Sequence, residues 1–144
     1  MKYFVSDDQY IVVLEKGELL LECLRDFAGQ TGIKTAWIQG VGASIELEIG
    51  YYDLEQQTYR WHQFNGAYEI TGLQGNVVRD DENMPLFHLH GTFSDTECKV
   101  YGGHINRLVV GGTCELFVQP TAALLTRKTD ENTGLRLLCD GPAV

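Results

Sequence analysis

The hydrophobic and polar positions of this chain follow two periods, one typical of a helix and one typical of strands. Between Glu18 and Gly29 the apolar residues recur every three or four positions, and charged residues fill the opposite side. Residues 45–51 alternate apolar and polar, as in a strand with one buried face and one wet face. The sequence therefore predicts one amphipathic helix with strands before and after it.

Short strands are predicted along the rest of the chain. They cover residues 9–14, 35–39, 58–64, 68–74, 77–79, 86–93, 100–104, 114–119, 123–127 and 135–138. Gly40-Val41-Gly42 is expected to form a tight turn between two strands, and Gly111-Gly112 a turn or a bulge. One helix among many strands predicts an α+β fold with a mostly antiparallel sheet. No repeat or linker divides the chain, so residues 1–144 are expected to form a single domain.

Composition and charge argue against several classes of function. Eleven Lys and Arg stand against twenty Asp and Glu, which gives a net charge of −9 and argues against direct binding to nucleic acid or anionic membranes. The cations are scattered, and Arg127-Lys128 is the only adjacent pair. The four cysteines form no C-x-x-C motif, and neither a signal peptide nor an apolar run of about 20 residues is present. We therefore expect a cytoplasmic protein with reduced thiols and no membrane segment.

Three of the four histidines lie within a stretch of 17 residues. His88 and His90 are two positions apart on a predicted strand, so their side chains share one face, while Leu89 belongs to the core face. A single strand histidine is more often an ordinary hydrogen-bonded side chain than a ligand, but His104 follows from the next strand. The cluster predicts a three-imidazole site for Zn²⁺, or for another divalent transition metal, with one coordination position open.

The surroundings of this predicted site are open to more than one interpretation. Gly102-Gly103 form either a hairpin or bulge, or a place where the backbone runs close to a ligand beside His104. A catalytic site needs a carboxylate as fourth ligand or general base, and the candidates are Glu69 and Glu115, each of which also has a purely structural interpretation. Cys98, between the histidines, either approaches the metal or lies in a solvated loop.

The order of several motifs is similar to that of the PPC (plants and prokaryotes conserved) domain. They are Gly40-Val41-Gly42-Ala43, Gly50-Tyr51-Tyr52-Asp53, residues 68–76, His88-Leu89-His90 and Gly102-Gly103-His104. The resemblance extends over nearly the whole chain and implies an α+β fold and a homotrimer. Plant members carry the domain downstream of an AT-hook, an Arg-Gly-Arg-Pro segment that lies in the minor groove of A·T-rich DNA. This sequence contains no such segment.

The histidine spacing also resembles that of acetolactate decarboxylase, an enzyme of similar fold that binds zinc through a His-x-His pair and a third histidine. Three functions are left open by these resemblances. The first is a metal-binding domain with a small-molecule ligand at the metal and a regulatory or otherwise undefined role. The second is a zinc-dependent enzyme acting on a small oxo-acid or ester, like a decarboxylase or hydrolase. The third is a DNA-binding or nucleoid-associated interaction module that reaches DNA through partners.

Overall fold

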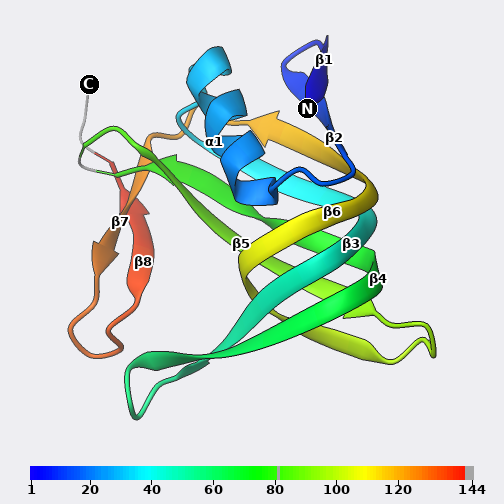
Figure 1. Cartoon of the computed structure of the whole chain (residues 1–144). Helices are drawn as coiled ribbons and strands as arrows, with labels where there is room; N and C mark the ends of the chain where they lie inside the picture. The colour runs from blue at the N-terminus through cyan, green and yellow to red at the C-terminus, as the bar shows by residue number, and fades with distance from the viewer. Residues whose placement is uncertain (81, 142–144) are drawn as a thin grey trace.

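Six strands pair into an antiparallel sheet that closes on itself, as the computed structural model shows (Figure 1). Their order is β1-β2-β6-β3-β4-β5, and β6 pairs with β5 as well as with β3, which makes a barrel of the last four. The structure describes residues 1–80 and 82–141. The strands are β1 (Lys2–Ser6), β2 (Gln9–Glu15), β3 (Ala36–Asp53), β4 (Thr58–Arg79), β5 (Pro85–Ser94), β6 (Val100–Pro120), β7 (Leu125–Thr129) and β8 (Arg136–Asp140).

The predicted amphipathic helix is α1 (Leu20–Thr31), which lies over one end of the barrel (Figure 1). Its apolar side, with Leu24 and Phe27, joins the barrel core. The helix ends at Gly32, which has a φ of 69° and whose N–H donates to the Ala28 carbonyl. Gly29 lies inside the helix because only Gly32 adopts the left-handed conformation that ends it. Within residues 1–80 and 82–141, no helix is long and apolar enough to cross a bilayer. The predicted α+β class with a mostly antiparallel sheet is confirmed.

The strands β3, β4 and β6 are much longer than the hydrophobic pattern of the sequence predicted. Gly40-Val41-Gly42 is not a tight turn, because β3 continues through it with irregular pairing between Gly40 and Gly42. A Cβ at Gly40 would lie 2.6 Å from the Glu115 carbonyl oxygen of β6. These glycines thus let two backbones approach where the strands bend, and bulges of this kind allow a sheet to curl into a barrel. Gly111-Gly112 likewise lies inside β6, at a register shift opposite Ser44.

The barrel interior holds the hydrophobic core and determines which side chains face outward. On β5, Leu89 and Phe93 are fully buried, whereas His90 between them is exposed. The alternation along this strand therefore places His88 and His90 on the outer wall of the barrel, as predicted.

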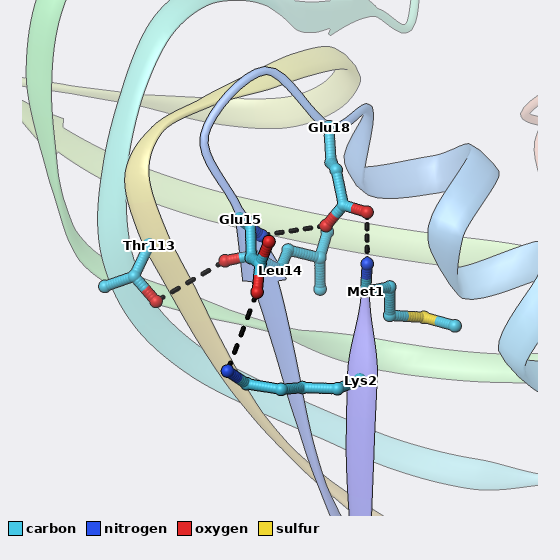
Figure 2. A network of polar contacts seen from close by, with 6 residues as sticks. All are labelled: Met1, Lys2, Leu14, Glu15, Glu18 and Thr113. Carbon is cyan, nitrogen blue, oxygen red and sulfur yellow. Dashed lines mark hydrogen bonds and ion pairs between the residues drawn. The ribbon is translucent and has the colours of Figure 1, made fainter.

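The N-terminal strand is joined to the start of the helix by a small polar network (Figure 2). The amino group of Met1 forms an ion pair with the Glu18 carboxylate, whose other oxygen accepts the Glu15 backbone N–H at 2.8 Å. Lys2 and the Glu15 carboxylate form a second ion pair at 3.6 Å. These contacts hold β1 and the end of β2 against the chain that leads into α1.

Candidate metal centre

The three clustered histidines meet where β6 changes its pairing partner. His104 pairs with Gly50 of β3 on one side and directly with His90 of β5 on the other. His88 is two residues before His90 on the same face and pairs with Asn76 of β4. Two neighbouring strands of the barrel wall, β5 and β6, thus bring together side chains that the sequence separates by up to 16 positions.

The nitrogen atoms of the triad are spaced as metal ligands require. The Nε2 atoms of His88 and His90 are 3.1 Å apart, and one ligand atom from each of the three rings lies within 4.8 Å of the others. A tetrahedral zinc ion at 2.0–2.1 Å holds two nitrogens about 3.3 Å apart. The buried Nδ1 of His104 has no hydrogen-bond partner among the described residues, so hydrogen bonding does not account for the placement of this ring. The residues present fit a divalent transition metal.

The surroundings keep these imidazoles neutral. Burial, the Arg127 guanidinium and the neighbouring His90 ring lower the pKa of His88 from 6.5 to about 4. Burial and the charges of the other two rings, with Arg127, lower the pKa of His104 to about 4 as well. Burial also lowers the pKa of His90. Since a metal ligand must be deprotonated, these lowered pKa values keep the rings available as ligands at neutral pH.

Two glycines before His104 allow the strands to meet. Gly102 and Gly103 lie inside β6, so the hairpin interpretation is wrong, and they pair with Thr92 and Gly91 of β5. A Cβ at Gly103 would lie 2.8 Å from the Gly50 carbonyl oxygen. The two glycines therefore allow the backbones of β3, β5 and β6 to approach closely. Both of them also line the pocket at the triad.

A pocket of about 700 Å³ opens at the triad. Its walls are the histidines, an aromatic side that includes Tyr59, and the hairpin of β7 and β8 with Arg127 and Leu135. Tyr59 stacks on Trp61 at 4.5 Å and contacts the His104 ring at 5.0 Å between centroids. Among the described lining residues there are three histidines and two arginines but no carboxylate, although the chain carries a net charge of −9. The pocket is therefore more positive than the rest of the surface.

The candidate carboxylates do not join the triad. Glu69 is exposed on β4 and pairs with Ser94, four residues along β5 from His90. Glu115 is exposed on β6 and lines a second pocket further along the outer wall. Cys98 is exposed in the loop between β5 and β6, in agreement with the solvated-loop interpretation. Within residues 1–80 and 82–141, the cluster of possible metal ligands at this place consists of the three histidines alone.

Arg127 of β7 is the residue of this site that sequence reasoning missed. Its guanidinium is buried and donates from Nη2 to His88 Nδ1 at 3.0 Å and to Asn76 Oδ1 at 2.9 Å. It lies 23 positions after His104, and the only signal in the sequence was its membership of the single adjacent basic pair. Hydrophobic periodicity describes one element at a time, so it does not show that this hairpin packs on the barrel wall.

Comparison with known proteins identifies the relatives of this chain. The profile of the Plants and Prokaryotes Conserved domain, abbreviated PCC or PPC, matches residues 1–122. No curated protein matches the sequence. The β7–β8 hairpin, and Arg127 with it, follows the matched range.

Three solved structures show how similar the relatives are. A protein from Archaeoglobus fulgidus described as metal-containing is 33% identical, with a TM-score of 0.81 and coverage of 96% of this chain and 97% of that chain. A PPC protein from Pyrococcus horikoshii is 29% identical, with a TM-score of 0.85 and coverage of 99% and 97%. A protein from Ralstonia eutropha that is provisionally named DNA-binding is 28% identical, with a TM-score of 0.89 and coverage of 96% and 95%.

The expected likeness to acetolactate decarboxylase is confirmed at the level of the fold. The enzyme from Bacillus subtilis superposes with a TM-score of 0.57 at 13% identity. The match covers 77% of this chain and 51% of the enzyme, so the likeness extends over about half of the enzyme's length.

Proposed function

This chain belongs to the Plants and Prokaryotes Conserved domain family, and we propose that it is a metal-binding member which holds Zn²⁺, or a related divalent ion, through His88, His90 and His104. The observation that carries the proposal is the convergence of three neutral imidazoles on an outer wall beside a pocket. The metal-containing relative from Archaeoglobus fulgidus supports it. Three nitrogen ligands leave one position of a tetrahedral ion open, which suits a small-molecule ligand.

Metal content tests this proposal directly. Protein purified without chelator or affinity metal is expected to contain close to one ion per chain by elemental analysis. His90→Ala should lower the affinity for zinc by at least about 100-fold, because one of three ligands is lost. His62→Ala is the matched control, since His62 is exposed on β4 and outside the triad. A wild-type protein that stays free of metal after incubation with zinc would refute the proposal.

A second candidate function is a zinc-dependent enzyme acting on a small oxo-acid or ester, which the pocket beside the triad favours. A zinc ion with an open position polarises a carbonyl group or activates water. The three histidines would hold the ion, while Tyr59 and the hairpin would limit the access of water to the pocket. Activated esters and 2-oxo acids, tested with and without metal, distinguish this function from simple binding. Turnover that survives His104→Ala would not depend on the triad.

Direct DNA binding is not part of the proposal, although the relative from Ralstonia eutropha carries that provisional name. A net charge of −9 repels the phosphate backbone. We expect no shift of duplex DNA in a gel at low salt, and a shift there would require a basic surface that the sequence does not indicate. An interaction module that reaches DNA through partner proteins is compatible with this result.

We further propose that the outer wall beside the triad is covered by other copies of the chain in a homotrimer. Ile11 and Val41 are exposed apolar side chains there, and they line a second pocket of about 780 Å³ to which His90 also contributes. Assembly over this wall would remove apolar surface from water and enclose the metal site from one side. Light scattering tests the assembly, and a monomer would contradict it.

A further inference from the structure

Arg127 is held against the triad by contacts that leave one of its donors unused. Nη1 donates to the Arg136 carbonyl at 2.8 Å, and Nη2 donates to Asn76 and His88. Nε is buried and has no partner among the described residues. Nε and Nη2 are neighbours on one edge of the guanidinium plane, so an unpartnered donor lies next to the nitrogen that contacts a predicted metal ligand.

The hairpin that carries Arg127 is attached to the barrel near the start of β7 and at its tip, which holds the backbone of the hairpin beside the triad. Thr126 Oγ1 donates to the Arg79 carbonyl at 2.9 Å near the start of β7. At the tip of the hairpin, Tyr52 Oη donates to the Thr133 carbonyl at 2.8 Å and Gln57 Nε2 to that of Asn132 at 3.1 Å. Figure 1 shows the two strands beside the barrel rather than within it.

The contact with His88 determines where the hydrogen of that ring lies. An arginine only donates, so His88 Nδ1 must accept, and the neutral ring carries its hydrogen on Nε2. That hydrogen points at His90 Nε2, which is 3.1 Å away and accepts it. In the metal-free protein, Arg127, His88 and His90 thus form an ordered chain of donors and acceptors.

This arrangement would change if His88 held a metal ion through Nε2. The lone pair on Nε2 would then be used for coordination, so the hydrogen of the neutral ring would occupy Nδ1 and oppose the Nη2 donor of Arg127. Two donors cannot share a hydrogen bond, so Nη2 would give up His88 and keep Asn76. Nη2 would then stand beside the unpartnered Nε of a side chain that lines the pocket.

We propose that Arg127 binds the carboxylate of a small organic acid next to the metal, and that metal coordination by His88 makes this guanidinium edge available. The inference rests on the proposed metal site and names the class of its ligand. Two parallel N–H groups match the two oxygens of a carboxylate, and no lining side chain among the described residues competes with it by negative charge. Tyr59 and Leu135 provide apolar walls suited to the carbon skeleton.

The arrangement makes binding of metal and carboxylate mutually dependent. If the metal strengthens carboxylate binding by some factor, the carboxylate strengthens metal binding by the same factor. Arg127 is the residue through which part of this coupling acts, so its replacement should reduce the carboxylate affinity of the zinc-loaded protein while the three ligands stay in place.

Calorimetric titration with pyruvate, as a simple 2-oxo carboxylate, tests the proposal on the full chain. We expect the zinc-loaded wild type to bind pyruvate and the metal-free protein to bind it at least about tenfold more weakly. In Arg127→Gln loaded with zinc, the affinity should fall by about 10- to 100-fold, the loss of a charge-assisted pair. Arg107→Gln is the matched control, because this exposed arginine pairs with Glu46 away from the pocket.

Further variants and a spectroscopic measurement separate the possible causes of a loss of pyruvate affinity. Gln57→Ala removes a hairpin anchor that does not line the pocket, so a fall in affinity equal to that of Arg127→Gln would overturn the role of the guanidinium. If Arg127→Gln fails to fold, Arg127→Lys keeps the charge without the two-pronged edge, and unchanged pyruvate affinity there would also overturn it. Nitrogen NMR of the His88 ring should show the hydrogen on Nε2 without metal and on Nδ1 with zinc.

The outcomes also distinguish this inference from the proposed function. Normal zinc content with equal pyruvate affinity in wild type and Arg127→Gln would overturn the carboxylate site and leave the metal site intact. Pyruvate binding that is equally tight with and without zinc would overturn it too. A wild type that binds no zinc would overturn the metal site and the carboxylate site together.

Discussion

Replacing Gly75 by alanine is expected to destabilise the protein and to displace the strand that carries His88 and His90. Gly75 of β4 pairs with Leu89 of β5. A Cβ built there would overlap the His88 carbonyl oxygen and would lie 2.9 Å from the Leu89 Cα. The atoms it meets belong to the backbone and cannot rotate away, so β5 itself must move.

The expected loss of unfolding free energy in Gly75→Ala follows from this geometry. Overpacking costs about 1–3 kcal/mol when side chains can adjust, and a rigid backbone places Gly75→Ala at or above the upper end, about 3 kcal/mol. Metal ligands tolerate distance errors of about 0.2 Å. Because β5 has to shift by more than that, zinc should also stabilise the variant less than it stabilises the wild type.

Gly72→Ala is the matched control on the same strand. Its Cβ would meet only the Thr92 hydroxyl, at 3.4 Å, so the free energy of unfolding should change by less than about 1 kcal/mol. Urea unfolding of both variants, with and without zinc, measures the difference. Equal unfolding free energies for Gly75→Ala and Gly72→Ala would show that β4 and β5 are not as closely apposed as the structure has them.

Three further predictions concern the hydrophobic core, the histidine rings and the two candidate carboxylates. Leu89→Ala removes a fully buried side chain and should cost about 2–5 kcal/mol in urea unfolding; a loss below 1 kcal/mol would contradict its place in the core. Metal-free protein should lose stability as the pH falls from about 6.5 to about 4. In that window the unfolded chain binds protons that the folded His88 and His104 rings, each with a pKa of about 4, do not. The loss is about 1–2 kcal/mol per ring once partial solvation is allowed for, and a melting temperature unchanged over this range would contradict the lowered pKa values. Glu69→Gln and Glu115→Gln should each keep the zinc content of the wild type, since neither carboxylate joins the triad, and a loss of zinc in either would place that residue in the site.

Part of the site could be predicted because it depends on one strand only. The alternation around Leu89 assigns His88 and His90 to the same outer face whatever β5 pairs with. The helix was likewise visible as a local period whose end the sequence places between Gly29 and Gly32, and the left-handed conformation of Gly32 marks where it stops. By contrast β1, a strand with every residue exposed, has no buried face to reveal it and was not predicted.

The remaining features depend on pairing between distant segments. The approach of His104 to His90 requires β6 to leave β3 and join β5, and the sequence suggested it only through spacing and resemblance. Gly40 and Gly42 were predicted as a turn because glycine permits both a turn and a close strand crossing, and only barrel closure selects the crossing. The pairing of β4 and β6 with their neighbours likewise places Glu69 and Glu115 away from the three histidines.

The sequence by itself determined the fold class, the outward face of the His88–His90 pair and the negative charge of the chain, because each of these is a sum or a period over neighbouring residues. The tertiary structure alone decided that the wall around this pair is locally positive and that Arg127 contacts His88 from a separate hairpin. The physical reason is that hydrogen bonds and charges act through space, whereas hydrophobic periodicity reports only which face of its own element a residue occupies.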